Sequence, residues 1–336
     1  MKALRTHSVG GPETLTLDDI EVPKPGKGQV LVEVKACAIN YPDTLMIRDL
    51  YQFKPERPYA PGGEIAGVIE AVGEGVDDFS VGDRVLAGIG SGGLAEKVVV
   101  PANRMFAIPD GMPFEKAASL LMTYGTNIHG LKDRGRISEG DTVLILGAAG
   151  GVGLSAVELS KAYGARVVAA VSSEEKGEVA RRAGADEVVI YPKSEMDKDA
   201  SKALANAFKA ACSPEGANIV YDIVGGQYSE PALRSIAWEG RFCVVGFPAG
   251  IAKMPLNLTL LKSCDICGVF WGAFTAREPE RFQAQVAELF QLMKDGKIDP
   301  VISETFPLER GGEAIARLEN REAVGKLVVT MDPGGD

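Results

Sequence analysis

The stretch 141–154, DTVLILGAAGGVGL, constrains the fold of this chain more than any other part of it. Its apolar run 143–146 is typical of a strand buried on both faces of a parallel sheet. Gly147, Gly150 and Gly153 follow at regular spacing. Such a trio permits a tight turn, lets the backbone approach a diphosphate and lets the next helix pack closely on the strand. The stretch therefore predicts a helix N-terminus that binds a phosphate.

The residues that follow complete a βαβ unit. Val152, Ala156, Leu159 and Tyr163 recur at helical spacing, and Gly164 ends the predicted helix. Residues 166–171 read as the second strand, which gives a unit of about thirty residues. A βαβ unit that binds no ligand is the alternative interpretation.

The bulk composition limits the class of protein. A length of 336 residues favours two domains. The sequence contains no run of eighteen apolar residues and no signal-peptide pattern at its start, so we expect a cytoplasmic protein with no membrane partner. The net charge of −10 argues against nucleic acid as a partner. The odd number of cysteines, 5, favours reduced thiols over a disulfide framework.

The pattern of predicted secondary structure changes twice along the chain. Residues 1–108 alternate and carry frequent turn residues, which predicts a compact β-barrel, and a helix is expected over 114–122. From residue 123 on, helices and strands alternate, which predicts a doubly wound parallel sheet. Its later strands are expected at 187–191, 219–223 and 242–245, and its later helices at 199–211 and 230–238. An apolar segment at 266–271, helices at 281–293 and 308–318 and a strand at 327–330 are expected to return to the first domain.

Several motifs occur in a fixed order along the whole chain. They are GGPE at 10–13, NYPD at 40–43, PGGE at 61–64, AGV at 66–68, VGDRV at 81–85, the glycine loop, and GK at 325–326. With these motifs the chain resembles the medium-chain dehydrogenase/reductase superfamily, and within it the zinc-independent NADPH:quinone oxidoreductase group that includes zeta-crystallin. The resemblance implies an α/β protein in which a Rossmann-type doubly wound parallel sheet is inserted in a GroES-like β-barrel catalytic domain. We therefore expect a catalytic domain of residues 1–122 plus 263–336 and an NADP-binding domain of residues 123–262.

The sequence lacks the ligands of a zinc site. Zinc-containing relatives carry a Cys in place of the segment at Asn40 and a His where this chain has Gly63, and a four-cysteine loop has no counterpart between Gly82 and Pro101. The chain has 2 histidines in all, too few for the usual ligand sets. The pair Cys264 and Cys267 has no second pair beside it, and a strand would point the two thiols to opposite faces, so we expect an ordinary core and loop role for it. No metal is expected.

The resemblance also implies the residues of the active site. Asn40, Asp43 and Tyr51 are expected in the cleft, and Thr126 with the backbone around Gly246, Phe247, Phe270 and Trp271 is expected to hold the nicotinamide. Without zinc, the favoured chemistry is hydride transfer to a quinone or to the activated double bond of an enone or enal, with Tyr51 donating to the developing oxyanion. Asn40 and Asp43 are also good turn residues, and Tyr51 could simply pack.

The substrate class stays open at this point. Many quinone reductases of the group carry a second tyrosine two residues after the motif aspartate, where this chain has Leu45. The departure raises the prospect of an alkene reductase, including one that acts on acrylyl-type acyl-CoA substrates. A non-catalytic, crystallin-like NADPH-binding protein is the alternative from another class.

The end of the second strand predicts NADPH as the cofactor. An NAD site needs a carboxylate there, but Val171 is followed by Ser172 and Ser173. Glu174 and Glu175 fit the first turn of the next helix, with a capping box between Ser172 and Glu175. Lys176 lies near the same helix start, where a cation gains nothing from the dipole and more plausibly serves a bound anion. The resemblance adds contacts to the cofactor. They are the glycine loop with Gly151 and Val152, and Ser173, Lys176, Tyr191 and Arg321.

The apolar run ICGVFW at 266–271 predicts a homodimer. Such a β-prone run at a sheet edge would be an aggregation hazard, and pairing with its copy across a two-fold axis would remove the edge.

Overall fold

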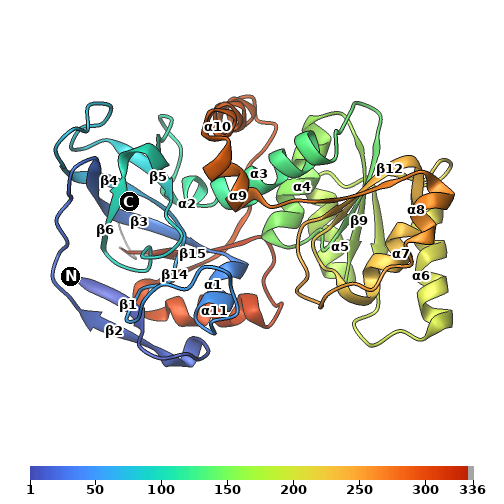
Figure 1. The fold of residues 1–336 in the computed structure, drawn as a ribbon, viewed down its shortest axis with the longest axis horizontal. Helices are drawn as coiled ribbons and strands as arrows, with labels where there is room; N and C mark the ends of the chain where they lie inside the picture. Colours follow the sequence, from blue (N-terminus) through green and yellow to red (C-terminus); the bar gives the residue numbers. More distant parts are fainter. Residues whose placement is uncertain (332–336) are drawn as a thin grey trace. The chain divides into compact units, whose positions relative to one another are not determined.

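The computed structural model describes residues 1–331 and divides them into two compact units. The first unit comprises Met1–Met122 and the described residues from Pro300 onward, and the second is Thr123–Asp299. The first unit is drawn in blue to teal for the N-terminal part of the chain and in red for the C-terminal part in Figure 1.

The first unit is built on one seven-stranded sheet and a two-stranded sheet. The large sheet has the order β14-β15-β3-β4-β5-β7, with β6 paired to β3, and the small one pairs β1 with β2. The C-terminal strand β15 lies antiparallel to β3, which joins the two chain ends in one sheet (Figure 1). The strands are β1 (Lys2–Thr6), β2 (Leu15–Asp19), β3 (Gln29–Ile39), β4 (Glu64–Val72), β5 (Arg84–Gly88), β6 (Lys97–Pro101), β7 (Met105–Ala107), β14 (Ile302–Pro307) and β15 (Lys326–Thr330).

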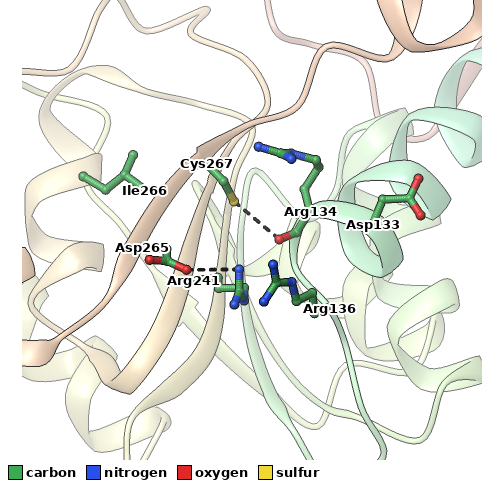
Figure 2. A pocket seen from close by; sticks show the side chains of 7 residues that line it. All are labelled: Asp133, Arg134, Arg136, Arg241, Asp265, Ile266 and Cys267. Atoms are coloured by element: carbon green, nitrogen blue, oxygen red, sulfur yellow. Dashed lines mark hydrogen bonds and ion pairs between the residues drawn. The ribbon is translucent and has the colours of Figure 1, made fainter. Parts of the chain in front are cut away.

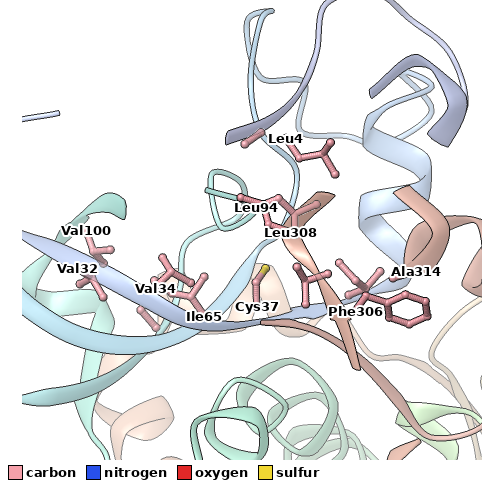
Figure 3. Packing of buried hydrophobic residues seen from close by; sticks show 14 of the residues in the cluster. Leu4, Val32, Val34, Cys37, Ile65, Leu94, Val100, Phe306, Leu308 and Ala314 are labelled. Atoms are coloured by element: carbon pink, nitrogen blue, oxygen red, sulfur yellow. The ribbon is translucent and has the colours of Figure 1, made fainter. Parts of the chain in front are cut away.

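Short helices close this unit. They are α1 (Tyr41–Met46), α2 (Phe114–Ala117), α11 (Gly311–Glu319), the 3-10 turns η1 (Pro12–Thr14), η2 (Ala102–Arg104) and η5 (Leu308–Arg310), and the start of α3 (Leu121–Ile128). Alternate residues of β3, such as Val32 and Val34, point into the core, where Ile65 and Phe306 from other strands meet them (Figure 3). The core thus includes both ends of the chain.

The second unit holds a six-stranded parallel sheet of order β10-β9-β8-β11-β12-β13. This is the Rossmann-type order, in which the chain winds outward from β8, returns and winds the other way. Because such crossovers are right-handed, helices before and after the return cover opposite faces. The strands are β8 (Thr142–Leu146), β9 (Arg166–Val171), β10 (Glu187–Ile190), β11 (Ala217–Asp222), β12 (Ile236–Val244) and β13 (Asp265–Gly268).

The helices of the second unit cover this sheet. They are most of α3, the π-helical turn η3 (His129–Arg134), α4 (Gly151–Ala162), α5 (Glu174–Arg182), α6 (Lys198–Ala211), the 3-10 turn η4 (Gly226–Tyr228), α7 (Ser229–Leu233), α8 (Asn257–Lys262), α9 (Trp271–Arg277) and α10 (Pro279–Lys294). On one face Leu204 and Phe208 of α6 pack with Leu144 and Val168 of the sheet. None of the helices in residues 1–331 is long and apolar enough to cross a membrane.

Most elements of the expected doubly wound sheet are confirmed, and four expectations need correction. The return to the first unit occurs at Pro300 and not at residue 263, because β13 pairs with β12 in the parallel sheet and Glu288 on α10 pairs with Lys132 of the same unit. The expected helix 230–238 ends at Leu233, because Ile236 already pairs with Ala217 as a strand residue. The helix 114–122 ends at Ala117.

The fourth correction concerns the cap of α5. The N-cap is Ser173, whose hydroxyl accepts from the Lys176 amide at 3.4 Å, and not Ser172. The short helix α1 within the otherwise all-β stretch was not expected.

Candidate functional site

The glycine loop lies at the carboxyl end of β8, beside the point where the strand order reverses. Gly147 has a φ of +75°, a conformation that favours glycine. A Cβ on Gly153 would lie 2.1 Å from the Gly147 carbonyl oxygen, so this glycine is required for close packing of α4. A Cβ on Gly150 would meet no other atom nearer than 3.7 Å. The loop therefore leaves open space at Gly150, next to the first-turn amides of α4, which have no partner within the helix.

Asp222, which sequence analysis missed, organises the neighbouring loop. It lies at the end of β11 and is 2% exposed. Its Oδ1 accepts from the amides of Val224 (2.9 Å) and Gly225 (2.8 Å), and its Oδ2 accepts from the Ser229 hydroxyl at 2.5 Å. Burial raises the pKa of Asp222, and these three donors oppose that rise. The sequence did carry a signal for Asp222, because an acidic residue at the end of a predicted strand is followed closely by Gly225 and Gly226.

A second missed residue, Asn127, ties α3 to the glycine loop. Its Nδ2 donates to the Val152 carbonyl and to the Ser155 hydroxyl, both at 2.7 Å. Asn127 is fully buried and follows Thr126, the residue expected at the nicotinamide. These two hydrogen bonds hold the end of α3, and with it Thr126, against the first turn of α4.

The residues expected around the nicotinamide partly come together. A Cβ on Gly125 would lie 2.8 Å from the Trp271 indole nitrogen, so Trp271 packs on the chain beside Thr126. That nitrogen is buried and has no hydrogen-bond partner among the described residues. The Gly246 amide donates to the Asp222 carbonyl at 3.2 Å. Phe247 is 56% and Phe270 60% exposed, so both offer free ring surface within this unit.

Ser172 and Ser173 follow the end of β9, and the exposed Glu174 and Glu175 come after them on the first turn of α5. Ser172, Ser173 and Lys176 are all half-buried. The Glu174 carboxylate is paired with Arg181 at 2.8 Å along α5. The main-chain amide of Tyr191 donates to the Val171 carbonyl at 2.9 Å, which brings the end of β10 beside the end of β9.

Two further expected cofactor residues are Tyr191 and Arg321. The Tyr191 ring packs on Tyr228 with ring centroids 4.6 Å apart and is 8% exposed, so most of it belongs to the core. Arg321 lies in the first unit, exposed, on the turn after α11 with a φ of +61°. The roles of both residues stay predictions.

In the first unit, Asn40 and Asp43 belong to a buried polar network around the start of α1. The Asn40 Nδ2 donates to the Glu64 Oε2 at 3.0 Å, and its Oδ1 accepts from the Lys326 ammonium at 2.7 Å. Lys326 lies 3.6 Å from the Glu64 carboxylate, and Glu64 also accepts from the Met122 amide at 2.9 Å. Glu64 and Lys326, known from the sequence only as motif residues, thus fix the side chain of Asn40.

The side chain of Asp43 hydrogen-bonds to backbone amides. Its two oxygens accept from the Asn40 amide at 2.8 Å and the Gly62 amide at 3.0 Å. It is 1% exposed, and burial raises its pKa to about 6 against the opposing effect of these amides and of Lys326. Asp43 therefore joins the start of α1 to the loop before β4.

Burial shifts the other ionisable members of the network toward their neutral forms. It raises the pKa of Glu64 and lowers the pKa of Lys326, and the attraction between the two groups opposes both shifts. Burial also raises the pKa of Cys37, which is fully buried beside the network. The buried ammonium of Lys326 thus lies close to buried carboxylates of opposite charge.

Tyr51 lies half-buried on the segment after α1. Burial and then the charge of Asp43 raise the pKa of its phenol, so the group is a hydrogen-bond donor at neutral pH. The side chains of Asn40 and Asp43, the other two residues expected to act in catalysis, are hydrogen-bonded within the buried network, whereas that of Tyr51 is not part of it.

The residues present do not fit a zinc site. In residues 1–331 no group of three or more His, Cys, Asp or Glu side chains is placed to hold a metal ion. Gly63 stands before Glu64, and the Lys326 ammonium, a cation itself, is 3.6 Å from the Glu64 carboxylate.

The chain matches known proteins over nearly its whole length. Residues 26–110 match the model of the alcohol dehydrogenase GroES-like domain, and residues 151–292 match that of the zinc-binding dehydrogenase family. The quinone oxidoreductase-like protein 2 homolog of Nematostella vectensis is 36% identical, covering 98% of this chain and 88% of the relative. Human quinone oxidoreductase is 33% identical, covering 98% of both.

Solved structures of quinone oxidoreductases and related proteins are also similar to this chain over nearly its whole length. A mycobacterial protein in complex with NADPH has a TM-score of 0.89 at 32% identity, covering 98% of this chain and 100% of that one. Escherichia coli quinone oxidoreductase, also in complex with NADPH, has a TM-score of 0.87 at 27% identity, covering 98% and 100%. The first unit is thus a GroES-like domain and the second a Rossmann-type domain, and the chain belongs to the quinone oxidoreductase group of the medium-chain dehydrogenase/reductase superfamily.

Proposed function

We propose that this protein is an NADPH-dependent oxidoreductase that reduces a quinone, or the activated double bond of an enone or enal, without a metal. The observation that carries the proposal is the open space at Gly150 beside the first-turn amides of α4, which suits a diphosphate. Two similar proteins were solved with NADPH, and similar proteins are named quinone oxidoreductases.

The second unit supplies the cofactor site. The glycine loop would hold the diphosphate, and Ser173 with Lys176 would hold the 2′-phosphate of the adenosine ribose. Glu174, the nearest carboxylate in sequence, is paired with Arg181, which favours a phosphate over a ribose hydroxyl at this position. Thr126 would orient the nicotinamide together with Trp271, whose ring packs beside Gly125.

The first unit supplies the group that acts on the substrate. Bound NADPH would deliver a hydride to an electrophilic carbon of the substrate. The Tyr51 phenol would donate to the oxygen on which negative charge develops, and the Asn40 to Asp43 turn would hold the segment that carries Tyr51. Leu45, half-buried on α1, stands where many quinone reductases have a second tyrosine, and this observation keeps alkene reduction, including that of acrylyl-type acyl-CoA, beside quinone reduction.

A nicotinamide absorbance assay tests the proposal. NADPH is mixed with the protein and with a quinone, an enone, an enal or an acrylyl thioester in turn, before and after prolonged EDTA treatment. We expect NADPH oxidation with at least one substrate and no loss after EDTA. NADPH binding without turnover of any substrate would favour the crystallin-like alternative, and loss of activity with EDTA would refute the metal-free mechanism.

A glycine variant tests the cofactor site itself. Gly150→Ala adds a methyl group whose nearest neighbour lies 3.7 Å away, so the protein alone tolerates it. Because the methyl group occupies the space assigned to the diphosphate, NADPH binding should weaken strongly while the melting temperature stays unchanged. Gly153→Ala is the structural comparison, because its methyl group would lie 2.1 Å from the Gly147 carbonyl oxygen and should lower stability.

We further propose a homodimer formed along β13. This strand is at one edge of the parallel sheet, and Ile266 in it is 38% exposed. Leu260 and Leu261 on α8 of the same unit are 79% and 62% exposed. An apolar edge strand with exposed leucines in the same unit fits pairing with a second copy. A cytoplasmic location stays a prediction, which cell fractionation would test.

A further inference from the structure

Two cysteines of the second unit, which lie 24 residues apart in the sequence, have their sulfur atoms 3.4 Å apart. Cys243 in β12 and Cys267 in β13 are register partners on neighbouring parallel strands. Their side chains therefore point to the same face of the sheet. Neighbouring strands lie about 4.8 Å apart, within the range of Cα separations that a disulfide spans. The sequence drew attention to Cys264 and Cys267 instead, because only the sheet reveals the true neighbour.

Cys267 lines a pocket of about 280 Å³ on this unit (Figure 2). Three arginines surround the pocket, namely Arg134, Arg136 and Arg241, together with Asp133 and Asp265. The Cys267 thiol donates a hydrogen bond to the Arg134 carbonyl oxygen at 3.6 Å, drawn as a dashed line in Figure 2. Cys267 is half-buried whereas Cys243 is fully buried, so a reagent in the pocket reaches Cys267 first.

Neighbouring groups lower the pKa of Cys267, although its thiol donates to a carbonyl oxygen. The hydrogen bond from Cys243, and then the charges of Arg134 and Arg241, lower the pKa of Cys267 to about 7, while burial and the Asp265 charge oppose this. Tyr221 in β11 is the register partner of Cys243, and its fully buried phenol is neutral, since burial raises its pKa. Burial raises the pKa of the other cysteines outside the pair, Cys37, Cys212 and Cys264. Cys267 is thus the nucleophilic thiol of the chain.

We propose that Cys267 and Cys243 form a reversible dithiol–disulfide site, in which Cys267 reacts first with a hydroperoxide that enters the arginine-lined pocket. The Cys267 thiolate attacks the peroxide oxygen, the O–O bond breaks, and a sulfenic acid and a hydroxide (or alkoxide) ion form. The Cys243 thiol then displaces the sulfenic hydroxyl, giving the disulfide and one water molecule. The two thiols are oxidised by two electrons and the peroxide is reduced. The disulfide joins the edge strand β13 covalently to β12.

Peptide mapping under non-reducing conditions tests this site. The native protein is treated with hydrogen peroxide, and free thiols are then blocked. We expect a Cys243–Cys267 crosslink that dithiothreitol reverses. Cys243→Ser should instead accumulate a Cys267 sulfenic acid that dimedone traps, and Cys267→Ser should give neither product. Cys264→Ser is the matched control from the same segment, and it should behave as the unmodified chain does.

The unmodified chain alone can refute the proposal. Cys267 left unreacted, Cys267 oxidised irreversibly without a crosslink, or a crosslink between Cys267 residues of two chains would each overturn it. The pH dependence of Cys267 alkylation gives a second readout, with an expected midpoint near 7. Asp265→Asn, which removes a negative charge, should lower that midpoint, and Arg241→Gln should raise it. A midpoint above 9 that neither variant moves would show that Cys267 is an ordinary packed thiol.

Discussion

The side-chain oxygen of Asn40 accepts a hydrogen bond from the Lys326 ammonium at 2.7 Å, although the two residues are 286 positions apart in the chain. Lys326 begins β15, which lies next to β3, and Asn40 directly follows β3. The pairing of these two strands thus places a buried cation from the C-terminal segment beside the turn that begins at Asn40.

Replacing Lys326 by Met should destabilise the protein. The variant leaves the Glu64 carboxylate, 1% exposed, without its cation, and breaking one partner of a buried ion pair costs about 3–5 kcal/mol. Urea denaturation measures the loss. Lys97→Met is the control, because the Lys97–Glu70 pair is partly exposed, with side chains 26% and 41% accessible, and should cost about 1 kcal/mol or less. Adding Glu64→Gln to Lys326→Met should recover part of the loss. Equal losses for the two lysine variants would show that the buried network contributes no special stability.

Asp43 should titrate near pH 6 in the folded protein. Its folded pKa lies above the ordinary aspartate value of 3.8, so ionised Asp43 lowers stability, an effect absent below about pH 4 and complete above about pH 6. Protonation also removes an acceptor from the Asn40 and Gly62 amides, so kcat/KM should fall as the pH drops below about 6. Carbon-13 chemical shifts of labelled aspartate carboxyls report the midpoint. A midpoint at or below 4 would contradict this assignment.

Tyr51→Phe should lower kcat about ten- to a hundredfold and leave cofactor affinity nearly unchanged, because a hydrogen bond to a charged group contributes about 1.5–3 kcal/mol and forms only as charge develops. Tyr59→Phe is a close control, because the buried Tyr59 hydroxyl has no partner among the described residues. Steady-state kinetics with both variants decide the role. If Tyr51→Phe changes only the melting temperature, Tyr51 is a packing residue.

Lys176→Ala should weaken NADPH binding about ten- to a hundredfold and leave NADH binding nearly unchanged, since one charge-assisted contact contributes about 1.5–3 kcal/mol. Lys202→Ala, on the exposed side of α6, controls for the loss of one positive charge. Fluorescence titration with both nucleotides provides the comparison. Equal kcat/KM for NADH and NADPH in the unmodified protein would reject the NADPH assignment and direct attention to Glu174.

The unmodified protein should have twice its chain mass of 35.5 kDa in solution, by light scattering at micromolar concentration. Ile266→Lys places a charge on the β13 edge and should give monomers. Val81→Lys replaces a residue that is 64% exposed in the first unit and should leave the dimer intact. A monomeric mass for the unmodified protein would refute the dimer.

Much of the second unit could be predicted because its signals are local. The apolar strand 142–146, the glycine spacing and the strand 166–171 each depend on neighbours in the sequence, and the structure has them where the pattern indicates. The failures involve long-range pairing. Residues 236–238 have a pattern compatible with a helix, but hydrogen bonding to β11 makes them a strand. Pairing of β13 with β12 likewise moves the unit boundary to Pro300.

The sequence by itself determined the glycine loop and the alternating strands and helices of the second unit, because these depend on backbone freedom at glycine and on periodicity, whereas Asn40, Asp43 and Tyr51 were indicated by the resemblance of the motifs to a known family. Only the tertiary structure decided what those residues touch. The contacts of Asn40 with Glu64 and Lys326, of Asp222 with its loop amides, and of Cys243 with Cys267 all follow from strand neighbours or chain turns. Burial and the distance to a partner set the charge state of an ionisable side chain, and both are properties of the packed chain.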